Sequence, residues 1–160
     1  MTKEYPYYGA SGIIDHVDDF IFDEPLILVA EDGANLFSRS TPLAFIASGK
    51  YWVNNHAHIL RPIEGPIDYW SYLLASIIYD PWITGSAQPK LTKDNLGSIH
   101  LPVPSKNERT GIVEFLNRET SKLDSLIAKI RITVGKLNEY RSALISAAVT
   151  GKIDVRQEAT

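Results

Sequence analysis

Two histidines stand close enough together to suggest a metal site. In the run "NNHAH", His56 and His58 are two residues apart on a predicted strand, so both side chains would point to the same face. A structural zinc ion takes about four ligands, cysteine is absent, and His16 and His100 have no recognisable ligand spacing to this pair. Hydrogen-bonded structural histidines and a ligand-facing polar cluster are the alternatives, and we predict neither a metal nor a cofactor.

The acidic residues of the first strands are a second candidate for catalysis. They are Asp15, Asp18, Asp19, Asp23 and Glu24. Carboxylates of this kind hold the metal ions of many nucleases, but no lysine is placed close to them here. A solvated surface rich in turns is the simpler interpretation.

Other catalytic signatures are absent from the sequence. The "DPWI" run at 80–83 shares only its first two residues with the loop by which amino-methyltransferases hold a target base, and a proline after aspartate is better explained as the end of a helix. The chain contains neither a G-x-x-x-x-G-K-[S/T] phosphate loop nor a G-x-S-x-G nucleophile turn. We therefore predict a binding protein without enzymatic activity.

Polar side chains of the amino-terminal part are the candidates for binding. Arginine, asparagine and serine are side chains that read base edges or contact phosphates. The candidate DNA-binding residues are Tyr7, Tyr8, Ser11, Asn35, Ser38, Arg39, Ser40, Lys50, Asn54 and Asn55. Because asparagine and serine are also ordinary turn residues, each residue alone is weak support.

The charge is divided unevenly along the chain. The net charge is −3, yet residues 1–104 carry 12 acidic against 6 basic residues, while residues 105–160 carry 7 against 10. A free-standing nucleic-acid binder normally has an excess of basic residues that neutralise phosphates. If this protein meets DNA, a partner must supply much of the phosphate contact.

The elements that would position these residues change character along the chain. Residues 5–62 contain short runs rich in aromatic and β-branched residues, which favour strands: "YPYYG", "GIIDHV", "FIFDE", "LILVAEDG", "LAFIAS" and "YWVNNHAHIL". Apolar spacing predicts a helix over 67–79 that Pro81 ends. One helical turn is expected at 93–96 and a short strand at 99–103, with prolines marking the domain boundary.

From about residue 106 to 150 the pattern is a heptad repeat. Every seventh residue is apolar (Leu116, Leu123, Ile130, Leu137 and Leu144), and Thr120, Ile127, Val134, Arg141 and Ala148 stand four positions after them. Gly151 is expected to stop the helix. Gly135 inside it indicates a local kink, a close helix crossing or a notch for a partner.

The fold class is therefore predicted as α+β, a small mixed α/β domain followed by a long carboxyl-terminal coiled-coil helix. A single helix with one apolar stripe needs a second helix to cover it. We expect an antiparallel homodimer whose seam is Leu116, Leu123, Ile127, Ile130, Val134, Leu137 and Leu144. No apolar run approaches the roughly 20 residues of a membrane helix, and without cysteine or a signal peptide we expect a cytoplasmic protein.

Over nearly its whole length the sequence resembles the specificity subunits of type I restriction-modification systems. The run from "YPYYG" to "NNHAHIL" is similar to one class of their target recognition domains, and "GSAQPKLTKDNLGSIHLPVPS" is similar to the junction that follows. The runs "IVEFLNRETSKLDSLIAKI" and "EYRSALISAAVTGKIDV" resemble their conserved helical region. The resemblance implies a recognition domain over 1–104, a conserved helix over 105–152 and a tail over 153–160.

The resemblance further implies a non-catalytic subunit that reads one half of a split target in double-stranded DNA. The helices would separate two recognition domains and dock methyltransferase (modification) subunits, and indirectly the restriction subunit. One recognition domain and one helical region imply a half subunit. Only "MTKE" precedes "YPYYG", so we expect a domain shortened at its amino terminus or completed in another way.

Two other functions are compatible with the residues. The main alternative is a coiled-coil regulatory or decoy protein derived from a specificity subunit. A metal-dependent enzyme would rest only on the histidine pair and the acidic residues.

Overall fold

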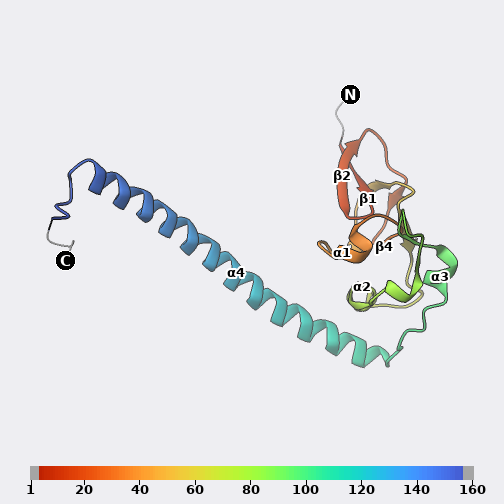
Figure 1. Cartoon of the computed structure of the whole chain (residues 1–160). Coiled ribbons are helices and arrows are strands. Elements are labelled where there is room, and N and C mark those ends of the chain that lie inside the picture. The colour runs from red at the N-terminus through yellow and green to blue at the C-terminus, as the bar shows by residue number, and fades with distance from the viewer. Residues whose placement is uncertain (1–3, 157–160) are drawn as a thin grey trace. The chain divides into compact units, whose positions relative to one another are not determined.

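The computed structural model describes residues 4–156, which form a strand-rich amino-terminal part and one long helix (Figure 1). In chain order the strands are β1 (Tyr5–Gly9), β2 (Gly12–Val17), β3 (Phe22–Asp23), β4 (Leu26–Ala30), β5 (Ala44–Ala47), β6 (Lys50–Val53), β7 (Ala57–Leu60), β8 (Ile83–Thr84) and β9 (Lys90–Leu91). The helices are α1 (Asn35–Ser38), α2 (Ile67–Ser76), the 3-10 turn η1 (Asp80–Trp82), α3 (Lys93–Gly97) and α4 (Lys106–Val149). The chain forms two compact units, Met1–Val113 and Glu114–Thr160.

Strand β4 is the centre of the first unit. Its five residues are all apolar and buried, and it pairs antiparallel with β5 on one side and β7 on the other. Because side chains alternate across a strand, Ile27 and Val29 join one hydrophobic cluster and Leu28 joins a second. One strand therefore connects two cores.

The two faces of this three-stranded sheet are covered by different elements. Helix α2 packs on β4 and β5 and contributes Leu74 to the first cluster. The second cluster contains Tyr51 and Val53 of β6, which lies in a four-stranded sheet of order β2-β1-β6-β3. Burial raises the pKa of the Tyr51 phenol to about 12, and its hydroxyl donates to the Glu24 carbonyl at 2.9 Å.

Two sequence expectations for this unit are wrong in detail. The run at 51–60 is two strands, β6 and β7, separated by a turn at 54–56. The run at 99–103 forms no strand, because Pro102 has no amide hydrogen for a ladder, and Ile99 and Leu101 pack against the first cluster instead.

Helix α2 is shorter than the 67–79 predicted for it. It ends at Ser76, and Ile77 is extended with ψ 137°. The change of direction buries Tyr79 completely and lets its hydroxyl donate to the Leu74 carbonyl at 2.8 Å. Burying an aromatic side chain stabilises the fold by more than one further turn of exposed helix. The helical turn predicted at 93–96 is confirmed as α3.

Helix α4 runs without a break from Lys106 to Val149, through Gly135. It ends at Gly151, which has φ 75°. The Gly151 amide donates to Ala148 at 3.2 Å and the Lys152 amide to Ala147 at 2.8 Å, the paired bonds of a Schellman ending. The predicted stop and the predicted fold class, a mixed α/β domain followed by a long helix, are confirmed.

Candidate nucleic-acid interface

Four turns of the first unit meet at one edge, which we call the loop edge: residues 10–11, 31–34, 54–56 and 85–89. Main-chain hydrogen bonds join these segments. The Asn54 amide donates to Tyr8 at 2.9 Å, the Glu31 amide to His56 at 3.0 Å, and the Gly33 amide to Pro89 at 3.3 Å. Segments far apart in the sequence thus form one continuous surface.

Parallel pairing explains why the turns at 10–11 and 54–56 are neighbours. Strands β1 and β6 are parallel, with Tyr7 beside Trp52 and Tyr8 beside Val53, so the turns that leave their carboxyl ends lie at the same edge of the sheet. Ser11 and Asn55 are exposed on these turns. Asn54 accepts the His56 amide hydrogen at 2.9 Å through its side chain. Of the predicted residues, the fold brings these three together.

The acidic residues of the loop edge each have a side-chain partner. Glu31 Oε1 lies 2.9 Å from Lys90 Nζ, and Asp32 Oδ2 lies 2.8 Å from His56 Nδ1. The hydrogen bond that Lys90 donates to Glu31 raises the pKa of Lys90, so this lysine is charged at neutral pH. Lys90 therefore offsets the negative charge of Glu31 at this edge.

The two histidines do not form the predicted pair. His56 is in the turn and faces Asp32, whereas His58 is on β7 with Nε2 2.7 Å from the Leu91 carbonyl. The prediction that His56 and His58 lie on one strand and point to the same face is wrong, because the asparagines at 54–55 start a turn. Residues 4–156 contain no group of three or more histidine, aspartate or glutamate residues able to hold a metal.

The predicted residues at 35–40 form a separate loop that includes α1. Asn35 holds this loop closed: its Nδ2 donates to Thr41 Oγ1 at 2.8 Å, and its Oδ1 accepts from the Thr41 amide at 3.1 Å and from Ser40 Oγ at 3.0 Å. Arg39, in the left-handed region with φ 49°, donates to the Ile77 carbonyl. Ser38 is exposed. These side chains shape the loop, and DNA contact by them stays a prediction.

The three remaining predicted residues lie outside the loop edge. The Tyr8 ring lies 5.5 Å from the Tyr51 ring and packs against the second hydrophobic cluster. Lys50 begins β6, at the opposite end of the strand from the turn, and lies 4.7 Å from the centre of the Phe20 ring. Tyr7 lines a pocket on the outer face of the four-stranded sheet.

The turn at 85–89 belongs to the loop edge although the sequence did not single it out. It joins the short strands β8 and β9 and exposes Gln88, a side chain able to pair with adenine. Gly85 has φ 85°, and a Cβ there would lie 2.5 Å from the Gln88 carbonyl, so the tight turn requires glycine. The "GSAQP" run, with glycine and proline at its ends, is the signal that could have found it.

Comparison with known proteins identifies the family. The model of the type I restriction modification DNA specificity domain matches residues 1–139. The chain belongs to this family. The predicted resemblance to specificity subunits is confirmed.

Two relatives show how much of a specificity subunit is present. A putative type I restriction enzyme specificity subunit of Haemophilus influenzae is 34% identical over 123 residues, which cover 76% of this chain and 31% of the relative. The EcoDI specificity subunit of Escherichia coli is 24% identical over 94% of this chain and 33% of its own length. The chain spans about a third of the curated relatives it matches.

The fold of the specificity domain is also found in a solved structure. The type I restriction-modification S subunit from M. genitalium aligns over 91% of this chain and 40% of its own, with a TM-score of 0.61 and 21% identity. The relatives are named as specificity subunits, which agrees with the prediction of a non-catalytic chain. Within the described residues, no helix is long and apolar enough to cross a membrane.

Proposed function

We propose that this chain acts as a DNA specificity subunit in a cytoplasmic type I restriction-modification complex. It reads one half-site of a split double-stranded target with its loop edge and docks modification subunits, and through them the restriction subunit. The loop edge carries this proposal, because it gathers exposed polar side chains from three of its four turns on a two-sheet scaffold. Residues 1–104 are the recognition domain and residues 105–152 the spacing and docking helix.

The residue types of the loop edge suit base reading better than phosphate binding. Ser11, Asn55 and Gln88 are uncharged donors and acceptors that can reach base edges, while Lys90 and His56 are engaged by acidic neighbours. Phosphate contacts supply much of the affinity of DNA-binding proteins. Modification subunits would provide them, and the chain alone should bind DNA weakly.

The exposed stripe of α4 supports dimerisation. Leu123, Ile127, Ile130, Val134, Leu137 and Leu144 are between 45% and 59% exposed in the single chain. Such a stripe is stable in water when a second helix covers it. Two antiparallel copies would place one recognition domain at each end of the pair, and a two-fold axis would make the target a split palindrome.

Shortening the helix should shorten the unspecified middle of the target. Deleting residues 123–129 removes one heptad and keeps the seam in register. At 1.5 Å per residue the two domains should approach by about 10 Å, close to three base pairs at about 3.4 Å each. Methylome sequencing of cells carrying this variant should show unchanged half-sites and a spacer about three base pairs shorter. An unchanged spacer would contradict the role of α4 as a ruler.

A substitution on the loop edge should change the sequence of the methylated half-site and leave the spacer length unchanged. Asn55→Ala removes an exposed amide from the turn beside β1, and loss of one base contact costs about 1–3 kcal/mol of discrimination. We expect relaxed methylation at one half-site position and an unchanged spacer. His100→Ala, on an exposed position between α3 and α4, is the control and should leave the methylome unchanged. If both variants changed the methylated sequence equally, the proposed role of the loop edge in reading bases would be contradicted.

The decoy alternative gives a different result in the same experiment. A regulatory or decoy protein would reduce methylation at the sites of a complete specificity subunit without creating new ones. Methylome sequencing with and without this gene therefore separates the two functions.

A further inference from the structure

The outer face of the four-stranded sheet contains a pocket of about 510 Å³, lined by Tyr7, Val17, Asp18, Asp19 and Trp52. Tyr7 and Trp52 are neighbours across the parallel β1–β6 ladder. The next residues along these strands, Tyr8 and Val53, point the opposite way, into or against the second hydrophobic cluster. The aromatic side chains of the pocket are thus on the face turned away from that core.

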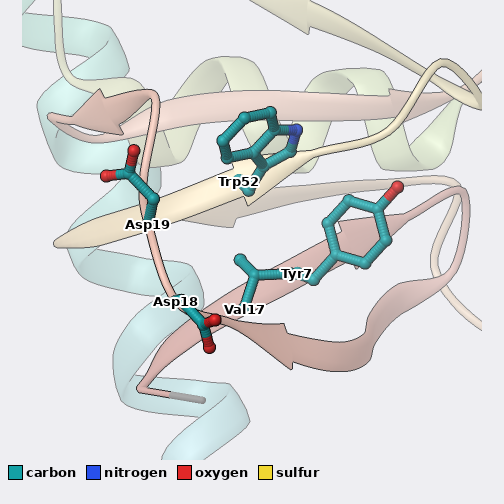
Figure 2. Close-up of a pocket in the computed structure, with 5 residues that line it drawn as sticks. All are labelled: Tyr7, Val17, Asp18, Asp19 and Trp52. Atoms are coloured by element: carbon teal, nitrogen blue, oxygen red, sulfur yellow. The ribbon is translucent and has the colours of Figure 1, made fainter. Parts of the chain in front are cut away.

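The pocket joins an aromatic part to an acidic part. In Figure 2 the Tyr7 and Trp52 rings lie toward one side and the Asp18 and Asp19 carboxylates toward the other, with Val17 between them. One Asp19 oxygen accepts the Phe20 amide hydrogen at 2.8 Å. Within residues 4–156, no hydrogen bond or ion pair engages the exposed Asp18 carboxylate. Negative charge is therefore available at the end of an apolar surface.

The same face already holds one cation on an aromatic ring. Lys50, two residues before Trp52 on β6, places its ammonium 4.7 Å from the centre of the Phe20 ring. The attraction comes from the negative face of the ring and is worth about 0.5–1 kcal/mol at exposed sites. Tyr7 and Trp52 offer a second such surface.

We propose that this pocket receives an arginine or lysine side chain from a protein partner. A guanidinium group can stack on the indole of Trp52 and pair with the aspartates at once. The surrounding unit is acidic, with 12 acidic against 6 basic residues over 1–104, which complements a basic segment. DNA phosphates would be repelled by the carboxylates, so this protein-docking pocket is distinct from the loop edge.

Binding of a capped Gly-Arg-Gly-Arg-Gly peptide tests the pocket. In the full chain, we expect a saturable shift of the Trp52 indole N–H signal in ¹H–¹⁵N spectra, assigned by its loss in Trp52→Phe. The peptide with citrulline in place of arginine keeps the shape without the charge and should cause no shift. A short DNA duplex should also leave the Trp52 signal unmoved.

Charge variants then test whether the arginine peptide binds at Asp18 and Asp19. Asp18→Asn with Asp19→Asn should weaken peptide binding about fivefold or more, since each exposed charge pair contributes up to about 1 kcal/mol. Asp80→Asn with Asp94→Asn changes the net charge equally elsewhere and should bind like the parent. Unchanged Trp70 and Trp82 indole signals show that each variant is folded. Equal binding of the citrulline peptide, full affinity in the Asp18 and Asp19 variant, or a DNA-dependent Trp52 shift would overturn the proposal.

Discussion

Replacing Ile130 by aspartate should convert a dimer of this chain into monomers. Ile130 lies in the proposed seam of α4 and is 52% exposed in the single chain. In the dimer the substitution would bury a carboxylate without a partner, once in each copy, at a cost of several kcal/mol. Each 1.4 kcal/mol changes the dissociation constant tenfold. Light scattering at micromolar concentration should report a dimer for the parent and a monomer for Ile130→Asp.

Ile132→Asp is the matched control for this substitution. Ile132 is 61% exposed and lies two residues further along α4, about 200° around the helix axis at about 100° per residue. The same chemical change is therefore made on the face away from the seam, and the dimer should persist. A monomeric parent, or a dimer that both variants leave intact, would contradict the helix-mediated dimer.

Replacing Arg109 by alanine should destabilise the first unit by about 2–4 kcal/mol, in the range of large-to-small core substitutions. Although it is charged, the Arg109 side chain is only 2% exposed. Its guanidinium lies 5.2 Å from the Trp70 ring centre and 2.7 Å from Glu64 Oε1. Arg109 also lowers the pKa of the Glu64 carboxyl, chiefly through this close contact. Alanine would leave a cavity beside Trp70.

Arg109→Met separates the contribution of side-chain packing to stability from that of the positive charge. Methionine fills most of the same volume, and the Glu64 side chain, 59% exposed, remains solvated after the cation is lost. Replacing a buried ion pair by an apolar side chain is often neutral or stabilising, so Arg109→Met should lose less than about 1.5 kcal/mol. Urea unfolding at one fixed protein concentration measures both variants.

Arg118→Ala is the exposed comparison for these variants. Arg118 is on the same helix and 59% exposed, and surface substitutions usually change the free energy of unfolding by less than about 0.5 kcal/mol. If Arg109→Ala and Arg118→Ala had the same effect, the proposed contribution of Arg109 to the stability of the first unit would be disproved.

The features that were predictable from the sequence are those that depend on local periodicity. The heptad spacing from Leu116 to Leu144 predicted a helix that the structure contains from Lys106 to Val149. Its end at Gly151 followed from the conformational freedom of glycine. Short runs enriched in aromatic and β-branched residues likewise located most of the strands.

The features that were missed depend on contacts between distant segments. No local pattern shows that the turn at 85–89 lies beside Gly33, or that Tyr79 leaves the helical path to fill the core. Arg109 looks like an ordinary surface residue in the heptad region, and its burial depends on Glu64 and Trp70. The candidate binding residues were chosen by type, and only the fold shows that Asn35 closes its own loop whereas Asn55 is exposed.

The backbone hydrogen bonds of the loop edge have a consequence for how new specificities can arise. Asn54, Glu31 and Gly33 hold neighbouring turns through main-chain amides, which every residue except proline can provide. Exposed side chains such as Ser11, Asn55 and Gln88 can therefore be exchanged without loss of the bonds that position them. Recognition of a different half-site could evolve, or be engineered, through substitutions on these turns while the two cores that share β4 remain unchanged.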